Sequence, residues 1–264
     1  MKIPTQKNRG TMMTKLTLLN VDLSQAELRV MAVLSQDKWM MDALQEGRGD
    51  FFNTHMMPVC FPWIEDEYGT VENYELIDPT GHKEDRTKVK GIQYGLAFGR
   101  QAFAISKALN ITKQAAVAII DNYLTTAYGF AEWRVNVMRA ATQPAYRDLL
   151  VNPFGRRFQS EIITAKKKSA IEREALSFLP QSTSSDICLS TAIRINDRLN
   201  ERGYYVFNLV HDAIMIEGPD DLAELSWAGN FICSELRLTG ERVMGPQVPF
   251  LAEWSTGDSW ADLS

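Results

Sequence analysis

The chain has 264 residues, of which 45% are hydrophobic and 23% are charged, as in ordinary globular proteins. Its formal net charge is −5, from 28 basic and 33 acidic residues, which excludes a protein that binds nucleic acid through overall positive charge. No apolar run is long enough to cross a membrane. The three cysteines, Cys60, Cys188 and Cys233, have neither metal-ligand spacing nor a disulfide framework, so a reducing compartment is expected.

The N-terminal part predicts a strand that ends in an acidic residue. Residues 1–14 predict a flexible leader, and residues 15–21 form an apolar, strand-like run that ends at Asp22. A helical pattern follows over residues 25–34. A carboxylate at the end of a buried strand is well placed to hold a metal ion, although this segment alone is a weak signal.

The stretch from about residue 36 to residue 150 is predicted to be largely helical. Apolar side chains between residues 116 and 124 share one helical face, with Thr112 as the expected N-cap. Residues 58–82 are richer in Pro, Gly and acidic side chains, and they predict a loop or a small excursion before the next helix.

Residues 85–99 carry four informative side chains at a spacing of four. The four, which would share one slowly drifting face of a helix, are Arg86, Lys90, Tyr94 and Phe98. The two cations can hold phosphate oxygens, and the two rings can lie against a sugar or a base. The segment alone equally allows a solvated basic edge that merges into a buried aromatic edge.

The C-terminal part predicts a helix, a hairpin, a second helix and a last strand. The first helix covers residues 182–202, and the second lies near residues 222–236. Between them, residues 204–219 form two apolar runs around His211 and Asp212, which predicts a β-hairpin with an acid at its tip. An acid in that position is most often a plain turn residue.

Together these segments resemble the DNA polymerases of family A, the DNA polymerase I type. The stretch from Asp22 to Arg29 is similar to the first palm motif of that family. The stretch from Arg86 to Gly95 is similar to its fingers-helix motif, and Val210-His211-Asp212 to its third motif. Further similarity lies in residues 155–157, 173, 180–186 and 248–260, and the resemblance covers about residues 15–264.

The resemblance implies an α+β fold in which a mainly helical fingers region is inserted into an antiparallel palm sheet. The palm would comprise residues 15–36, with the first motif, and residues 181–264, with a helix, the catalytic hairpin and the C-terminal strand. The fingers would comprise residues 37–180. The thumb and the upstream palm strands of the family would be absent.

The activity implied is that of a DNA-directed DNA polymerase. The primer 3′ hydroxyl would attack the α-phosphate of a bound deoxynucleoside triphosphate, and pyrophosphate would leave. Two Mg²⁺ ions would be held by Asp22 and Asp212, with the backbone carbonyl of Leu23 as a further ligand. Lys90 would be the third catalytic residue, because it would contact the phosphates and could protonate the leaving group.

Other side chains would bind the two substrates. Arg86 would hold the terminal phosphate, and Glu27 would crowd the 2′ position of the sugar and so favour deoxynucleotides. The residues expected to bind the nucleotide are Gln25, Glu27, Arg86, Lys90, Tyr94 and Phe98. The residues expected to contact primer–template DNA are Arg173, Gln181 and His211.

The sequence departs from the family pattern near the expected site. Ala213 stands where an acid usually follows the His-Asp pair, so weaker or altered metal dependence is expected. Phe98 stands where the family often has Tyr, and it cannot donate a hydrogen bond to Glu27. Phe52 replaces a His expected shortly after Asp50, which removes one phosphate contact.

The expected absence of the thumb leads to the expectation of a partner. Without upstream palm strands, the strand before Asp22 should expose an apolar edge and face. A second polypeptide would then carry the thumb and the remaining palm, with or without an exonuclease, to form a split polymerase. Phage genomes are one expected source of such split genes. The enzyme would work in the cytoplasm of a bacterial cell or a phage-infected host cell, without contact with a membrane.

Two other functions fit parts of the pattern. The first is a non-catalytic remnant that binds DNA or a polymerase partner. Against it stands the joint retention of Asp22, Glu27, Arg86, Lys90 and Asp212. The second is a different two-metal enzyme such as a nuclease, which has no use for a triphosphate-binding helix. Metal-dependent nucleotide incorporation distinguishes a polymerase from both.

Overall fold

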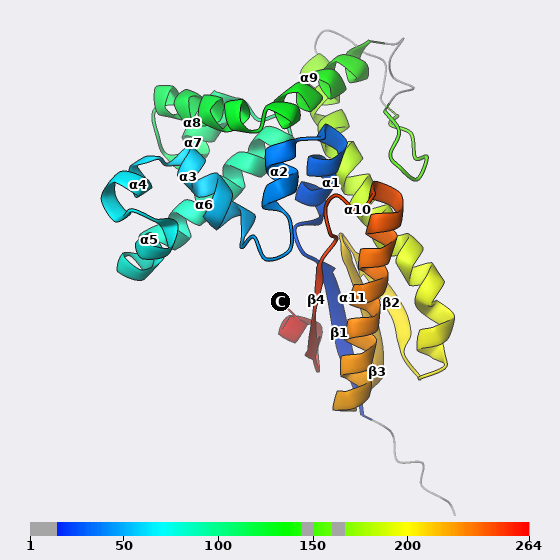
Figure 1. Ribbon diagram of the computed structural model, residues 1–264. Helices are drawn as coiled ribbons and strands as arrows, with labels where there is room; N and C mark the ends of the chain where they lie inside the picture. Colours follow the sequence, from blue (N-terminus) through cyan, green and yellow to red (C-terminus); the bar gives the residue numbers. More distant parts are fainter. Residues whose placement is uncertain (1–14, 144–149, 160–166, 264) are drawn as a thin grey trace, which may run out of the picture.

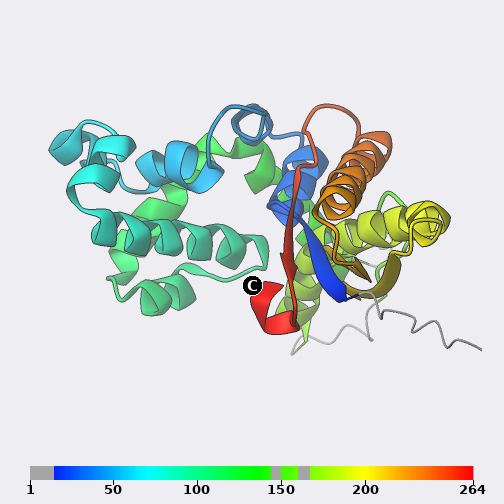
Figure 2. The same ribbon diagram turned by 90° about the horizontal axis from the view of Figure 1, so that it is seen from below.

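The computed structural model describes residues 15–143, 150–159 and 167–263. A small sheet with two long helices forms one part of the molecule (Figure 1), and a larger group of helices lies to one side of the sheet (Figure 2). All neighbouring strands of the sheet run antiparallel. The predicted α+β fold is therefore confirmed. The leader predicted over residues 1–14 lies outside the described residues.

The sheet has the strand order β2–β3–β1–β4. Its strands are β1 (Leu16–Leu23), β2 (Tyr205–Val210), β3 (Ala213–Pro219) and β4 (Ala252–Gly257). Because β3 and β4 pair with its two edges, β1 is an inner strand. The expectation that β1 exposes an apolar edge is therefore wrong, since the C-terminal part of the same chain supplies both neighbours.

The two faces of β1 differ in burial. Leu19, Val21 and Leu23 are at most 1% exposed, and they lie on the face that packs against α11 (Leu222–Met244). Alternation along the strand places Asp22 on the opposite face, outside this apolar core. The expected exposure of this apolar face is thus also wrong, because α11 covers it.

The longest helix, α10 (Lys168–Asn200), connects the two parts of the molecule. It packs against α9 (Tyr128–Thr142), α1 (Ala26–Ser35) and α11. Its first half contributes to a small apolar cluster with α9, and its second half to the main core. The helix predicted over residues 182–202 therefore begins earlier, and the predicted border between residues 180 and 181 lies inside α10. The division into palm and fingers stays a prediction.

Pro180 is buried inside α10. Proline has no N–H, so the Leu176 carbonyl one turn earlier lacks its helical donor. The following hydroxyls bond back to the helix: Thr183 donates to the Leu179 carbonyl (2.6 Å), and Ser184 to the Pro180 carbonyl (2.9 Å). Such bonds often accompany a bend.

The larger part of the molecule is helical, as predicted for residues 36–150. Its elements are α2 (Lys38–Ala43), the π-helix η1 (Phe51–Met56), α3 (Met57–Cys60), α4 (Trp63–Tyr68), α5 (Val71–Ile77), α6 (Pro79–Ala97), α7 (Ala102–Leu109), α8 (Lys113–Thr126) and α9. Thr112 caps α8 as predicted, because its hydroxyl accepts a hydrogen bond from the Ala115 N–H. Of the two alternatives predicted for residues 58–82, the loop is wrong, since helices α3 to α5 occupy most of this stretch. Thr70 caps α5 in the same way as Thr112 caps α8.

The helix α6 begins with a strong start signal. Asp78 accepts a hydrogen bond from the Gly81 N–H, and Pro79 occupies the first turn, where its missing N–H is not needed. Val89, Ile92 and Leu96 are buried and fix the inner face of the helix. The opposite side of α6 therefore presents the predicted basic and aromatic side chains.

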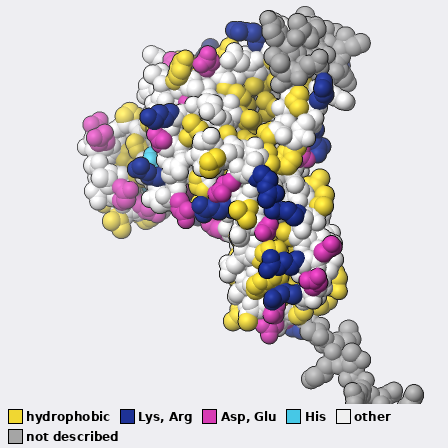
Figure 3. Space-filling view, turned by 45° about the vertical axis from the view of Figure 1, so that its right-hand side comes forward, with side chains coloured by type: hydrophobic (Ala, Val, Ile, Leu, Met, Phe, Trp, Pro, Cys, Tyr) yellow, Lys and Arg dark blue, Asp and Glu magenta, His cyan; other side chains and the backbone are white. Residues whose placement is uncertain are grey.

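Arginine side chains near the end of α10 and just beyond it lie over aromatic rings of α11. The Arg198 guanidinium lies 4.5 Å from the centre of the Phe231 ring, and that of Arg202 lies 4.0 Å from Trp227. Figure 3 shows basic side chains among hydrophobic ones on this part of the surface. Basic charge is thus used here for packing between two helices. No helix in the described ranges is both long and apolar enough to span a membrane.

Candidate active site

The hairpin of β2 and β3 closes with the two-residue turn His211-Asp212, as predicted. His211 has a φ of 55°, a left-handed conformation that costs a residue with a Cβ about 1 kcal/mol. The tip is held from two sides, because the Leu23 N–H and the Cys188 thiol both donate to the Asp212 carbonyl, each at 3.1 Å. The end of β1, the hairpin tip and α10 therefore meet at one corner.

Asp22 stands at this corner between two neighbouring strands. It pairs with Ala213 on β3 and with Glu253 on β4. Directly opposed side chains point to the same face of a sheet. The Asp22 carboxylate therefore has a methyl group on one side and a second carboxylate on the other.

The acidic groups at the corner repel one another. The pKa of Asp22 is raised to about 6, first by burial and then by the negative charges of Asp212 and Glu253, while His211 opposes this rise. Burial also raises the pKa of Asp212. Two partly buried carboxylates that repel each other are stabilised by a bound cation.

The donor atoms at the corner fit a divalent cation such as Mg²⁺. Carboxylate oxygens are the hard ligands that Mg²⁺ prefers, and Mg²⁺ usually takes one or two of them together with water and substrate oxygens. The described residues contain no group of three or more His, Cys, Asp or Glu side chains arranged to hold a metal ion. Asp22 and Asp212 would thus be the protein's side-chain ligands. The Leu23 side chain is buried, so its predicted role concerns only the backbone carbonyl.

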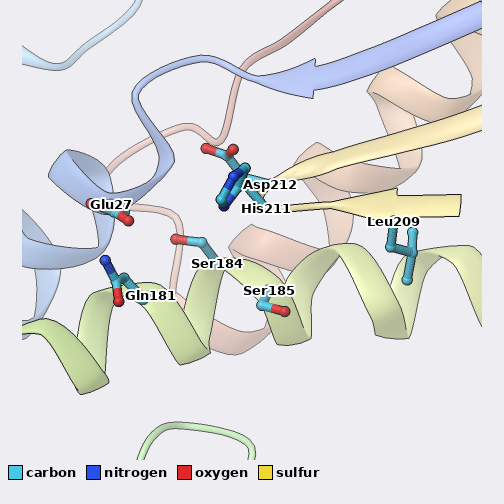
Figure 4. A pocket seen from close by; sticks show the side chains of 7 residues that line it. All are labelled: Glu27, Gln181, Ser184, Ser185, Leu209, His211 and Asp212. Atoms are coloured by element: carbon cyan, nitrogen blue, oxygen red, sulfur yellow. The ribbon is translucent and has the colours of Figure 1, made fainter. Parts of the chain in front are cut away.

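A cavity of about 340 Å³ opens beside the hairpin tip (Figure 4). Its lining comes from α1, α10 and the hairpin, and consists of Glu27, Gln181, Ser184, Ser185, Leu209, His211 and Asp212. Four of these residues were predicted from the sequence, from three separate segments. The structure therefore brings the first and third motifs together with Gln181 on α10.

The carboxylate of Glu27 faces the amide of Gln181 across this cavity (Figure 4). A hydrogen bond from Gln181 lowers the pKa of Glu27, but burial and the charge of Asp212 raise it more strongly. Phe98 has no hydroxyl that could donate to Glu27. Among the described residues, the side chain that donates a hydrogen bond to Glu27 is that of Gln181.

The basic face of α6 meets the first motif through Asp50. Arg86 donates from Nε (3.3 Å) and Nη2 (2.9 Å) to the two oxygens of Asp50, and Gln25 donates to the same carboxylate at 3.0 Å. Lys90 is exposed one turn further along α6 and forms no ion pair with any described residue. The predicted phosphate-binding side chains thus lie one turn apart on α6, and Arg86 is joined to the start of α1 through Asp50.

The aromatic side chains of α6 continue this face. The Tyr94 ring is stacked on Phe98 with centres 6.0 Å apart, and it lies 6.1 Å from Phe52. The pKa of Tyr94 is raised to about 12 by burial and by the charges of Glu27, Asp212 and Asp50. Tyr94 is therefore close to the acidic corner as well as to the basic side chains.

Arg173 lies away from the cavity that contains Gln181. It is exposed on α10, and its side chain crosses the end of α6 so closely that a Cβ on Gly99 would meet Arg173 Cγ at 2.7 Å. The predicted DNA-contacting residues therefore form two groups, with Gln181 and His211 at the cavity and Arg173 beside α6. Their contact with DNA stays a prediction.

A second cavity of about 280 Å³ lies on the other side of the hairpin tip. Asp22 and Asp212 line it together with Trp260 of the C-terminal 3₁₀ helix η3 (Trp260–Leu263). The sequence reasoning did not assign Trp260, Glu253 or Asp50 to the site. Glu253 becomes evident only from the register of β4 with β1, and Asp50 only from its contacts with Arg86 and Gln25.

Comparison with known proteins gives the family. The sequence matches DNA polymerase family A over residues 4–262. It is 30% identical over 246 residues to the thermostable DNA polymerase I of Thermus thermophilus, and 28% identical over 248 residues to DNA polymerase I of Pseudomonas aeruginosa. Each match covers 92% of this chain, but only 27% and 24% of the respective relative. The chain thus spans about a quarter of the length of these relatives.

The fold also matches a solved polymerase structure. The polymerase domain of Pol1 from M. smegmatis, in complex with DNA primer-template and dNTP, superimposes with a TM-score of 0.73 at 23% sequence identity. The match covers 94% of this chain and 40% of that chain. Together with the sequence match over nearly the full length, this shows that the chain belongs to DNA polymerase family A.

Proposed function

We propose that this chain carries the catalytic centre of a DNA-directed DNA polymerase, which adds deoxynucleotides to the 3′ end of a primer. The observation that supports it most directly is the meeting of the acidic corner with the face of α6. Tyr94 of that face lies close enough to the corner for the charge of Asp212 to raise its pKa, and Arg86 donates to Asp50, which also binds Gln25 of the first motif. Acidic side chains that can hold a metal ion and basic side chains that can bind a triphosphate thus lie near each other.

The side chains of α6 would bind and orient the triphosphate. Phosphoryl transfer depends mainly on positioning and on neutralising charge. The exposed ammonium of Lys90 can bind phosphate oxygens as a point charge, and it carries a proton that the leaving pyrophosphate can accept. Arg86 would bind the terminal phosphate, and Tyr94 would lie against the sugar and base. Divalent cations held by Asp22 and Asp212 would supply further neutralisation of negative charge.

The cavity beside the hairpin tip would receive the sugar of the nucleotide and the end of the primer. Glu27, held by Gln181, would occupy the space that a 2′ hydroxyl requires, and so exclude ribonucleotides. His211 and Gln181 would contact the DNA strands there, and Arg173 would contact them beside α6. Gln25 would act from the start of α1, through its bond to Asp50.

The test is primer extension by the chain with Mg²⁺ on a primed template, with Asp212→Asn as the control. Extension by the wild type and its loss in Asp212→Asn is the expected result, because the variant removes one of the two charges that hold the cation. Asn occupies nearly the same volume, so the fold should persist, and circular dichroism checks it. A metal-independent signal, or equal extension by the variant, would contradict the proposed function.

We further propose that a second polypeptide completes the grip on duplex DNA. Arg198 and Arg202 lie over the rings of α11, and the net charge is −5, so overall positive charge does not supply a grip on duplex DNA. Tyr205 and Phe207 also remain exposed on the edge strand β2. If the chain extends a primer only weakly, addition of a candidate thumb-bearing polypeptide should raise the number of nucleotides added per binding event. No change in that number would count against a partner.

A further inference from the structure

Asp50 joins two segments that carry predicted nucleotide-binding residues to a third segment, η1. It precedes η1, whereas Gln25 precedes α1 and Arg86 lies in α6. Its carboxylate accepts four hydrogen bonds: from Nε and Nη2 of Arg86 at 3.3 and 2.9 Å, from Gln25 Nε2 at 3.0 Å, and from the Asn53 N–H at 3.0 Å. Within the described ranges, no other side chain of the proposed site forms hydrogen bonds with all three segments.

Two of the four donors fix the carboxylate independently of Arg86. The bond from the Asn53 N–H is an N-cap, which ties Asp50 to the first turn of η1. The bond from Gln25 comes from a residue with a left-handed backbone, at φ 55°, immediately before α1. With its side chain only 27% exposed, Asp50 is therefore anchored whether or not Arg86 is bound to it.

Asp50 occupies one edge of the Arg86 guanidinium and leaves the other edge free for a ligand. A guanidinium has five N–H donors, of which Nε–H and one Nη2–H point to Asp50. Its central carbon, Cζ, lies over the Phe52 ring, 5.9 Å from the ring centre, which further limits its rotation. The remaining donors can bind phosphate oxygens in the fork geometry that guanidinium groups adopt.

We propose that Asp50 is a positioning residue for the triphosphate, which holds Arg86 and Gln25 in the orientation that the nucleotide requires. This inference rests on the proposed function and deepens it, because it assigns to Asp50 the pre-alignment of the phosphate-binding arginine. A fixed guanidinium loses less rotational freedom when it binds phosphate than a mobile one does. The negative charge of Asp50 by itself repels phosphate. If Asp50 acts by positioning Arg86, removal of this charge should weaken triphosphate binding, whereas electrostatic repulsion alone predicts that binding becomes tighter.

The test is a calorimetric titration of a deoxynucleoside triphosphate into the full chain. The chain is bound to a primer–template that ends in a dideoxynucleotide, in Mg²⁺ buffer, so that no incorporation occurs. Asp50→Asn should weaken binding about tenfold, although it removes a negative charge, because Asn cannot accept the paired bonds of Arg86 as strongly. Asn is also a good N-cap, so η1 should keep its start. Asp121→Asn, which changes an exposed acid on α8, is the matched control and should bind as the wild type does.

Two further variants, Arg86→Ala and the double variant Asp50→Asn with Arg86→Ala, separate a positioning role of Asp50 from a structural one. If Asp50 acts through Arg86, the double variant should bind no more weakly than Arg86→Ala alone. If instead the losses of binding free energy in the two single variants simply add in the double variant, and the melting temperatures fall in parallel, Asp50 is a structural N-cap. That result would overturn the inference. Tighter binding by Asp50→Asn would show that its carboxylate competes with phosphate, which would also overturn it. A wild-type chain that binds no triphosphate would defeat the proposed function, and the inference with it.

Discussion

At Asp22, the pKa of about 6 links the acidic corner to the stability of the fold. This value lies above the ordinary 3.8, so between about pH 4 and pH 6 the folded chain binds a proton that the unfolded chain has lost. In metal-free buffer, the free energy of unfolding should therefore fall as the pH rises through this window, and then level off. Part of the site is exposed to solvent, which screens the repulsion.

Asp22→Asn should accordingly raise the free energy of unfolding at pH 7.5, by on the order of 1 kcal/mol after allowance for screening. At pH 4 the two proteins should be equally stable, because Asp22 is then protonated in the folded wild type. Denaturant unfolding at both pH values, without metal, measures this. A variant that is less stable than the wild type at pH 7.5 would mean that Asp22 is stabilised, not repelled, by its surroundings.

The selection of the sugar should depend on Gln181, because Gln181 is the described partner of Glu27. Gln181→Leu should raise the ratio of ribonucleotide to deoxynucleotide incorporation about tenfold, since Glu27 then loses the hydrogen bond that holds it in place. Phe98→Tyr, added to this variant, should restore part of the selection by offering Glu27 a hydroxyl. Ser185→Ala changes another residue of the same cavity and should leave the ratio unchanged. Single-nucleotide incorporation assays measure this ratio. An unchanged ratio in Gln181→Leu would refute the role of Gln181 in the selection of the sugar.

Among individual residues, the sequence predicted the acids of the corner but not how they are held. Asp22 and Asp212 stood out because each ends an apolar run. Glu253 did not, because its place beside Asp22 depends on which residues of β4 and β1 are paired, and pairing is a long-range property. Asp50 likewise acquires its partners only when η1 and α6 pack together.

Between elements, α11 approaches β4 so closely that glycine is required at position 229. A Cβ on Gly229 would meet the Trp254 ring at 2.5 Å, and this half-buried ring, whose Nε1–H donates to Asn230 Oδ1, cannot shift freely. By contrast, a Cβ on Gly91 in α6 would meet nothing within 4 Å. The same substitution should therefore have opposite effects at these two helical positions.

Gly229→Ala should lower the free energy of unfolding by about 1–3 kcal/mol, because overpacking outweighs the gain in helix propensity. Gly91→Ala should raise it by about 0.5–1 kcal/mol, because only the propensity changes. Thermal and denaturant unfolding of both variants provides the comparison. If Gly229→Ala were also stabilising, the close contact of α11 with Trp254 would not exist in solution.

Helices and strands with strong local signals were predicted well, and the failures have a common cause. Thr112 caps α8, and Asp212 lies in a tight turn, as local sequence indicates. Helices α4 and α5 were missed because Pro and Gly suggested a loop, whereas Thr70 caps α5 and buried Tyr74 anchors it. The expected bare edge of β1 was wrong because its neighbours β3 and β4 follow about 190 and 230 residues later in the chain, beyond the reach of local pattern.

Across the whole molecule, one apolar cluster connects the sheet with the helical region. It contains Leu19 and Ile214 of the sheet, Val30 of α1, and Val89 and Ile120 of the helical region. Parts of a protein that share a core generally unfold together. The two parts should therefore unfold in one cooperative transition, even though they would act as palm and fingers.

Single-tryptophan variants that retain either Trp39 or Trp254 can report on the two parts separately. Trp39 packs on Phe51 and Tyr123 in the helical region, and Trp254 lies on β4. Their fluorescence should change at the same urea concentration, and far-UV circular dichroism should change with them. Midpoints that differ beyond error would show that the shared cluster is too weak to couple the two parts.

The buried proline in α10 has a mechanical consequence for the assembled site. Gln181 and Ser184 lie immediately beyond Pro180, whereas Arg173 lies before it, so the helix acts as a lever with its weak point beside the cavity. From Pro180 back to Arg173 the helix runs about 10 Å at 1.5 Å per residue, and a bend of about 10° would carry Arg173 about 2 Å sideways. A small change of the helix angle at Pro180 would thus move Arg173 relative to Glu27 and Gln181.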